Sequence, residues 1–316
     1  MANFLRNRRL PQALRLGTLA GVSLVTALVW TAAPAAQSAA QSAQRDQRNQ
    51  TVFIGVLNKD GAPPATLTTK DVSIREDGNV REILTVGPAT TPMQVAVLVD
   101  TSQVSRDSIP DLRASVKAFG AAIWAKSPDS EISLYTFGER PVQLVDYTTS
   151  APVLDRGVDK LFAASGAGAY FIDAVIESAD ALAKRTPVRG VIVAFVDENG
   201  PEFSNRRHQQ VFDALARARA SLWTITRQAF NSTAMTSETR ERASVVGDVT
   251  TRSGGRGVTV FAPSALRDRF TDIADALHAQ FAVTYGRPET LIPPDRLEIR
   301  LTLEGYRLTA PRWTNQ

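Results

Sequence analysis

The stretch MQVAVLVDTSQVS, residues 93–105, predicts the fold of this chain. Its apolar, β-branched run from Val95 to Val99 ends abruptly in Asp100, and Ser102 follows two positions later. Such a short run, bounded by polar residues, indicates a strand that is buried on both faces. In open α/β sheets, ligands bind beyond the carboxyl ends of the strands. A carboxylate and a hydroxyl at this point suit a hard cation, and the alternative is that both side chains only cap the loop before the next helix.

Between residues 93 and 286, strand-like and helix-like segments alternate, which predicts an α/β fold with a doubly wound, mostly parallel sheet. The expected strands are at residues 95–99, 132–137, 191–196, 222–226 and 258–261. Five helices are expected. One begins at residue 108, three cover residues 172–182, 206–219 and 264–279, and another ends at Gly254-Gly255. Such a sheet is covered by helices on both faces.

The segments on either side predict antiparallel strands instead. Residues 51–88 contain a strand and a hairpin with Asp77-Gly78 at its turn. Residues 297–304 alternate strictly between apolar and polar side chains, which is typical of a strand with one solvated face. Because an isolated hairpin is marginal in water, we expect the C-terminal strands of residues 287–316 to pair with the N-terminal β region in a small antiparallel subdomain.

The segment DTSQV, Asp100 to Val104, looks like an altered copy of the DxSxS motif of von Willebrand factor type A domains, where it forms the metal-ion-dependent adhesion site. The chain resembles in particular the bacterial VWFA-related proteins, which place a small β region before the A domain. Further segments that resemble this family, in the same order, are the β region at 51–83, SGAGAYFIDAV (165–175), VIVAFVDENG (191–200), SGGRGVTVF (253–261) and HAQFAVTYGRP (278–288). The resemblance implies a doubly wound A-like domain.

The resemblance also implies a metal site in which two positions are altered. In A domains that bind metal, five positions matter: the Asp and two Ser of the motif, a Thr on a separate loop, and an Asp after a later central strand. Asp100, Ser102 and Asp197 match three of them, whereas Val104 replaces the second Ser and Ala169 stands where the Thr would be. Water can complete the shell of Mg²⁺, and Ca²⁺ tolerates looser geometry. The resemblance therefore implies a degenerate adhesion site in which Asp100, Ser102 and Asp197 bind Mg²⁺ or Ca²⁺.

The charge of the two aspartates leaves an alternative to a metal. Two carboxylates in one crevice repel each other unless a cation, a shared proton or a basic side chain compensates them. Arg106 is the nearest basic residue in the sequence, so the alternative is an ion pair with Arg106.

Four further residues near the expected site have open roles. Glu198 and Glu202 follow the strand at 191–196 and form either a partner-binding rim or a solvated acidic loop. We expect Phe171 in the core, and Tyr170 is either a core residue or an exposed contact.

The N-terminus has the layout of a secretory signal peptide. An apolar segment at residues 16–30, and then the small residues TAAPAAQSAA, follow the arginines Arg6, Arg8, Arg9 and Arg15. We therefore expect a cleaved signal peptide over residues 1–36, a disordered polar linker over 37–50, and a secreted or periplasmic protein. The alternative is an uncleaved membrane anchor. The chain has no cysteine, which excludes a disulfide framework and a thiol nucleophile.

Charge and composition exclude several functions. The net charge is +4, and the four N-terminal arginines account for all of it, so no basic face for nucleic acid is visible. The chain has only two histidines, His208 and His278, and neither a G-x-S-x-G nor an H-E-x-x-H motif. We expect a non-enzymatic, adhesion-type protein-interaction module whose protein partner completes the metal shell with an acidic residue. The alternatives are a structural envelope or assembly component with a vestigial site and, less favoured, a metal-dependent hydrolase built on Asp100 and Asp197.

Overall fold

The computed structural model of the 316-residue chain describes residues 49–186, 189–228, 236–287 and 294–312. All of them belong to one compact unit, residues 45–316. The signal peptide predicted for residues 1–36 and nearly all of the linker predicted for 37–50 lie outside the described residues. Within the described ranges, no helix combines the length and the apolar composition that crossing a membrane requires.

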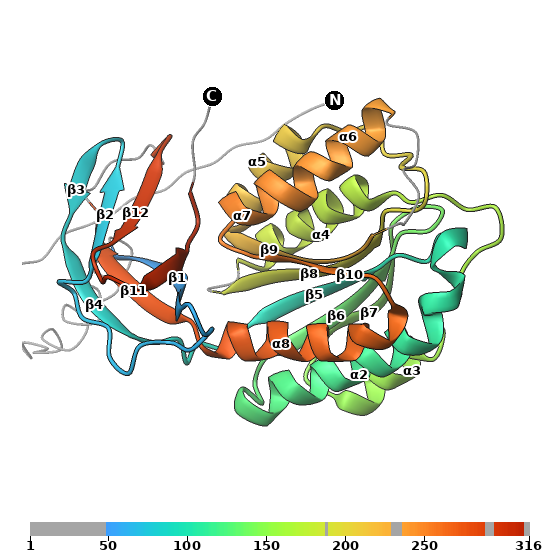
Figure 1. Ribbon diagram of the computed structural model, residues 1–316, viewed down its shortest axis with the longest axis horizontal. Coiled ribbons are helices and arrows are strands. Elements are labelled where there is room, and N and C mark those ends of the chain that lie inside the picture. The colour runs from blue at the N-terminus through green and yellow to red at the C-terminus, as the bar shows by residue number, and fades with distance from the viewer. Residues whose placement is uncertain (1–48, 187–188, 229–235, 288–293, 313–316) are drawn as a thin grey trace, which may run out of the picture. The chain divides into compact units, whose positions relative to one another are not determined.

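A six-stranded sheet forms the centre of the α/β part (Figure 1). Its strands, in spatial order, are β10 (Gly257–Val260), β9 (Ala220–Arg227), β8 (Gly190–Asp197), β5 (Gln94–Val99), β6 (Glu131–Thr136) and β7 (Val142–Thr148). All neighbouring strands are parallel except β6 and β7. The doubly wound, mostly parallel sheet predicted from the sequence is confirmed. The edge strand β7 was not predicted from the sequence, because Val145 is its only buried residue.

Helices cover both faces of the central sheet, as Figure 1 shows. One face is covered by α2 (Ile109–Lys126), α3 (Ala151–Val158) and α8 (Leu266–His278), and short 3₁₀ helices, η1 (Gln103–Ser108) and η3 (Pro263–Ala265), precede α2 and α8. The other face is covered by α4 (Phe171–Arg185), α5 (His208–Ala218) and a continuous run of α6 (Ser237–Ser244), the π-helix η2 (Val245–Val249) and α7 (Thr250–Arg252). Alternate residues of β5 belong to the two apolar cores, which is why this strand is apolar on both sides.

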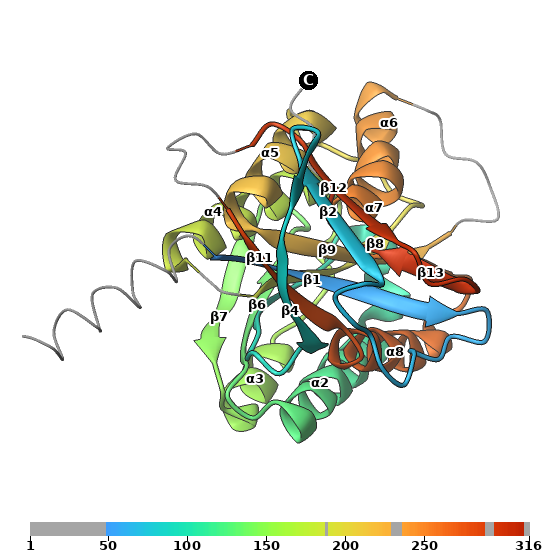
Figure 2. The same ribbon diagram turned by 90° about the vertical axis from the view of Figure 1, so that its left-hand side faces the viewer.

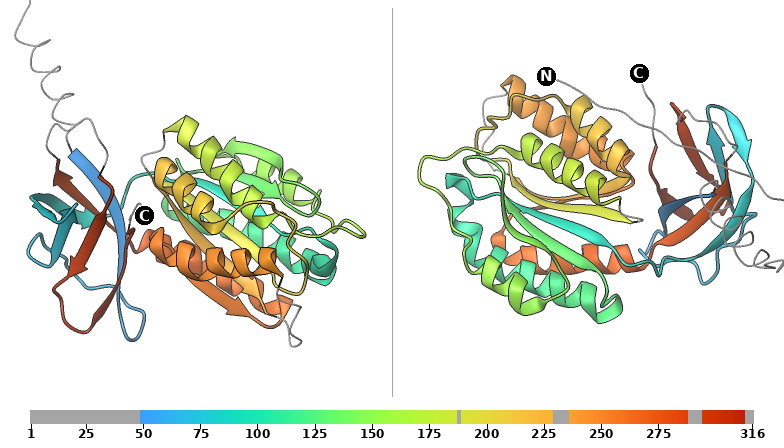
Figure 3. Two further views of the ribbon diagram at one scale, coloured as in Figure 1. Left: turned by 90° about the horizontal axis from the view of Figure 1, so that it is seen from above. Right: turned by 180° about the vertical axis from the view of Figure 1, so that it is seen from behind.

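Seven further strands form two antiparallel sheets (Figures 2 and 3). One has the order β13 (Tyr306–Thr309), β1 (Asn49–Asn58), β11 (Phe281–Gly286), β4 (Ile83–Pro88), and the other has the order β12 (Leu297–Leu301), β2 (Val72–Glu76), β3 (Asn79–Arg81). The C-terminal strands therefore pair with the N-terminal ones, β13 with β1 and β12 with β2. A third apolar core lies between the two sheets. The small antiparallel subdomain predicted from both ends of the sequence is confirmed.

Arg189, directly before β8, connects the central sheet to the segments that lead into the antiparallel strands. Its side chain is buried, and its guanidinium donates to the carbonyl oxygens of Ala89 at 3.1 Å and Thr91 at 3.2 Å. It also donates to the side-chain oxygen of Gln280 at 2.9 Å and to the carbonyl of Leu277. The amino end of β8 is thus fixed to the start of β11 and to the segment before β5.

Candidate functional site

The carboxyl ends of β5 and β8 bring the three predicted site residues together. The two strands are parallel neighbours, Asp100 follows β5, and Asp197 is the last residue of β8. The backbone N–H of Asp197 donates to Oδ2 of Asp100 at 3.1 Å, and the N–H of Ser102 donates to Oδ1 at 2.8 Å. All three residues are fully buried. The crevice expected at this edge of the sheet therefore holds two carboxylates and one hydroxyl.

Two backbone N–H groups, of Ser102 and Asp197, donate hydrogen bonds to the carboxylate of Asp100. Burial raises the pKa of Asp100 above its ordinary value, and the hydrogen bonds from Ser102 and from the backbone of Asp197 oppose this rise in part. The hydroxyl oxygens of Ser102 and Ser105 are buried beside this loop and have no hydrogen-bond partner within the described part of the chain. The hydroxyl of Ser102 thus lies at the position that the resemblance assigns to a ligand.

Asp197 is neutralised by an arginine from the neighbouring strand. Its Oδ1 accepts hydrogen bonds from the backbone and the side chain of Asn199, at 3.1 and 2.7 Å. Its Oδ2 lies 2.5 Å from Nη2 of Arg227, the last residue of β9, which pairs with Asp197 in the parallel register. The same Nη2 donates to the carbonyl oxygen of Val104 at 2.8 Å. The guanidinium therefore links Asp197 to the residue that stands in place of the second motif serine.

The expected ion pair with Arg106 is wrong, because Arg106 is exposed on η1 and Arg227 pairs with Asp197 instead. The sequence did contain a signal for Arg227. It is the first residue after the strand predicted at 222–226, just as Asp197 is the first after the strand predicted at 191–196. The rule that placed the aspartates at the sheet edge applies equally to this arginine.

The arrangement does not fit a divalent cation while Arg227 is in place. Mg²⁺ and Ca²⁺ need six or more oxygens around one point, some of which water can supply. Here each oxygen of Asp100 and Asp197 already accepts a hydrogen bond or an ion pair, and Val104 and Ala169 offer no side-chain oxygen. Among the described residues, no group of three or more His, Asp or Glu is placed to hold a metal ion. Binding of Mg²⁺ or Ca²⁺ stays a prediction from the resemblance.

Comparisons with known proteins give solved structures only. No family model matches the chain, and no curated protein does. The VWA domain of SpRpn10 is 17% identical with a TM-score of 0.42, over 56% of this chain and 93% of that one. The vWF domain of the type V pili tip protein Mfa5 from Porphyromonas gingivalis is 12% identical with a TM-score of 0.46, over 60% of this chain and 96% of that one. Likeness at this level says nothing about function.

The motifs that carry the sequence resemblance lie at one edge of the doubly wound sheet. The DTSQV segment follows β5, the acidic segment follows β8, and SGAGAYFIDAV leads into α4. A doubly wound sheet with helices on both faces is the fold that the sequence resemblance to von Willebrand factor A domains implies. The contact of Arg227 with Asp197 bears on whether the motif could also bind a metal.

Glu202 lies in the loop after β8, but it is neither part of an exposed rim nor solvated, because it is 3% exposed. Its Oε1 accepts the N–H of Ser204 at 3.2 Å, and its Oε2 is buried with no hydrogen-bond partner in the described ranges. Burial raises the pKa of Glu202 from 4.5 to about 7. The buried side chain of Arg242, from α6, holds the same loop by donating to the carbonyl oxygens of Glu198 and Gly200.

Aromatic side chains lie next to this loop. Phe171 is fully buried, as predicted. Tyr170 is half-buried, and its ring centroid is 6.0 Å from that of Phe203, which is 51% exposed. Phe203 packs over Gly168, where a Cβ atom would come within 2.1 Å of the ring. The glycine therefore allows this exposed aromatic ring to pack closely against the neighbouring loop.

Proposed function

We propose that the chain is an exported, non-enzymatic protein-interaction module that contacts a protein partner through the loops at the carboxyl edge of its central sheet. The observation that carries this proposal is a set of exposed aromatic side chains. Six large apolar side chains are exposed in the described part of the chain, and the aromatic ones among them are Phe162, Phe203 and Phe261. Large aromatic residues dominate the energetics of protein–protein interfaces, so their exposure favours a contact surface.

All three phenylalanines lie on loops at the edge that carries Asp100 and Asp197. Phe162 begins a loop whose backbone is bonded to the DTSQV segment, from Ala164 N–H to the Thr101 carbonyl at 3.0 Å. Phe203 lies in the loop after β8, and Phe261 directly follows β10. A surface assembled from loops on a rigid sheet is the usual place for binding in α/β folds.

Arg227 supports binding that does not depend on a metal. In a metal-loaded site, a partner carboxylate can complete the cation's shell. The guanidinium here makes its ion pair with Asp197 and its hydrogen bond to Val104 inside the protein. An acidic residue of a partner therefore has no open coordination position to fill. We propose that Arg227 takes the place of the divalent cation and that the partner binds through apolar contacts.

Two of the expectations from the sequence are kept in this proposal. One is the interaction module that the resemblance implies, and the other is the vestigial metal site, which was expected for a structural envelope component. The other two expectations, a partner acid that completes a metal shell and a metal-dependent hydrolase, both require a cation between Asp100 and Asp197. The contact of Arg227 with Asp197 argues against both. Export rests on the N-terminal sequence alone, which has the layout of a signal peptide.

The experiment is capture of a partner from an envelope extract of the encoding organism, followed by affinity measurement with the identified partner. We expect equal capture with excess magnesium and with EDTA. The double variant Phe162→Ser, Phe203→Ser is expected to lose about 2 kcal/mol or more of binding free energy, roughly 30-fold in Kd. The control is Val80→Ser, since Val80 is 65% exposed on β3 in the antiparallel part. Capture that EDTA abolishes, or a double variant that binds as well as the control, would contradict the proposal.

A further inference from the structure

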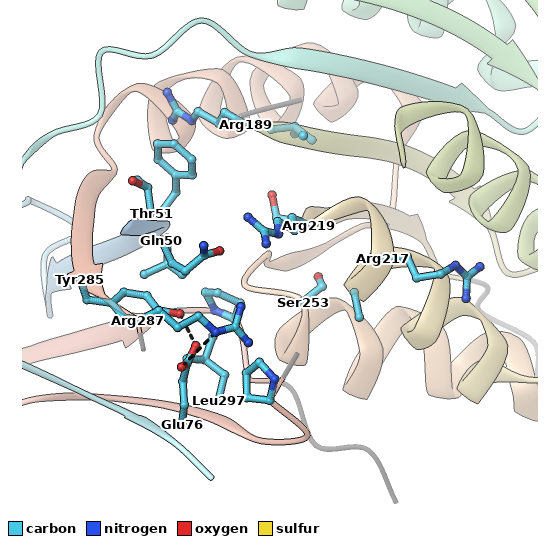
Figure 4. A pocket seen from close by; sticks show the side chains of 18 of the residues that line it. Gln50, Thr51, Glu76, Arg189, Arg217, Arg219, Ser253, Tyr285, Arg287 and Leu297 are labelled. Carbon is cyan, nitrogen blue, oxygen red and sulfur yellow. Dashed lines mark hydrogen bonds and ion pairs between the residues drawn. The ribbon is translucent and has the colours of Figure 1, made fainter. Parts of the chain in front are cut away.

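A cavity of about 730 Å³, drawn in Figure 4, is lined by residues at the amino ends of β8 and β9, which is the edge of the central sheet opposite the exposed phenylalanines. The amino ends of β8 and β9 and the end of α5 line one side, and residues of β1, β2, β11 and β12 line the other. This volume is in the range of sites that bind small molecules. The cavity is therefore large enough for a ligand and is separate from the proposed protein-binding edge.

The charged residues that line the cavity are mostly cations. They are Arg189, Arg217, Arg219 and Arg287, against the two carboxylates of Glu76 and Asp213. Arg217 is neutralised from outside the cavity, because its Nη2 lies 2.9 Å from Oδ1 of Asp180. Arg189 donates to neutral oxygens, the carbonyls and the Gln280 amide described above, and its guanidinium carbon lies 4.9 Å from the ring centroid of Phe53, so no carboxylate among the described residues neutralises it. Positive charge is left over inside the cavity.

Glu76 does not neutralise this excess, because its carboxylate is already shared. Its Oε2 lies 3.0 Å from Nε of Arg81 and 3.4 Å from Nε of Arg287, and its Oε1 accepts the hydroxyl of Tyr285 at 2.8 Å. Two guanidinium groups thus share one carboxylate. Arg219 forms no ion pair within the part of the chain that the structure describes. Even with the carboxylate of Asp213 counted, the lining of the cavity therefore carries more guanidinium groups than carboxylates.

Arg219 and Arg287 face the cavity from its two sides (Figure 4). Arg287 extends from the end of β11, and its Nη2 is buried with no hydrogen-bond partner among the described residues. Arg219 ends α5 in the left-handed conformation, with φ 50°. Burial and Glu76 raise the pKa of Tyr285, while Arg287 and Arg219 oppose that rise, so both cations lie within electrostatic range of one hydroxyl.

We propose that this cavity binds a small organic anion whose carboxylate or phosphate group lies between the guanidinium groups of Arg219 and Arg287. The unpartnered Nη2 of Arg287 supplies one donor, and the guanidinium of the exposed Arg219 supplies others; charged N–H donors of this kind form strong hydrogen bonds with carboxylate and phosphate oxygens. The apolar part of the ligand packs against Val52, Leu297 and Pro311, which line the same cavity. This site is independent of the proposed protein contact.

The test is calorimetric titration of the full mature chain with inorganic phosphate and, separately, with benzoate, at constant ionic strength. Benzylamine, which carries the same ring with a positive charge, is the ligand control. We expect at least one of the two anions to bind and benzylamine not to bind. The variants Arg219→Gln and Arg287→Gln are each expected to weaken binding about tenfold or more, because each removes charged hydrogen bonds. Binding of benzoate alone identifies a carboxylate ligand, and binding of phosphate alone identifies a phosphate ligand.

The matched control variant is Arg267→Gln, which removes the same charge from an exposed position on α8. If Arg267→Gln weakens binding as much as Arg219→Gln, the attraction is a property of the net charge and the proposal is wrong. It is equally wrong if neither anion binds, or if benzylamine binds as well as benzoate. Thermal unfolding of each variant without ligand separates loss of the site from loss of the fold.

Discussion

Replacing Arg227 by methionine is expected to lower the free energy of unfolding by about 3–5 kcal/mol, the usual cost of removing one partner of a buried ion pair. The carboxylate of Asp197 is fully buried, and the side chain of Arg227 is 15% exposed, so water replaces little of the lost interaction. The carbonyl oxygen of Val104 also loses its donor. Methionine replaces the apolar stem of arginine and lacks the guanidinium, so most of the loss reports on the guanidinium.

The assay is urea unfolding of four proteins: the wild type, Arg227→Met, Asp197→Asn and the double variant. Asparagine at position 197 keeps an oxygen for the hydrogen bonds from Asn199 and carries no charge. The double variant should therefore regain most of the stability that Arg227→Met loses. The coupling energy of this cycle is expected to exceed about 2 kcal/mol, because the two residues are in direct contact.

The same proteins test whether Arg227 stands in for a metal. Without the guanidinium, the buried charge of Asp197 can be compensated by a divalent cation, so magnesium or calcium chloride should raise the melting temperature of Arg227→Met. The wild type should show no such rise beyond that of sodium chloride at equal ionic strength. Stabilisation of the wild type by either divalent cation, or a coupling energy near zero, would refute the reasoning.

Three further variants test the burial of Glu202 and the close packing at Gly255. Burial raises the pKa of Glu202 from 4.5 to about 7, so the folded state binds an extra proton between these values and wild-type stability falls as the pH rises through them. The free energy of unfolding of Glu202→Gln, measured with urea and compared with that of the wild type, should therefore rise by about 3 kcal/mol between pH 4.5 and pH 8. A difference between the two proteins that does not vary with pH would contradict the burial argument. Gly255→Ala would place a Cβ 1.7 Å from the carbonyl oxygen of Leu222, so it should lose about 3 kcal/mol or more, whereas Gly247→Ala, with open space around the Cβ, should change thermal stability little.

The sequence was most informative where a residue's role follows from its place on a strand. The apolar run before Asp100 and the one before Asp197 each predicted a buried parallel strand, and parallel strands end at the same edge of a sheet. That was enough to bring the two carboxylates together. The antiparallel pairing of the chain ends could also be predicted, because alternating strands that are marginal alone need partners.

The misses have a common physical cause. An edge strand such as β7 buries one side chain, so its pattern is weak. Glu202 looked like a solvated loop residue because burial of a carboxylate is visible only in three dimensions. Arg106 was expected as the basic partner because it is close to Asp100 in the sequence. The actual partner of Asp197 is Arg227, from the neighbouring strand β9, which lies 30 positions further along the chain (227 minus 197).

By itself, the sequence determined the class of fold, the order of its elements and the edge at which the aspartates meet, because these depend on local patterns of apolar residues. Only the tertiary structure decided what surrounds those aspartates. The register of β8 against β9 places Arg227 opposite Asp197, and the folding of both chain ends onto one subdomain gathers the arginines of the cavity. Electrostatic compensation depends on distance in space, and distance in space is set by the packing of strands that lie far apart in the sequence.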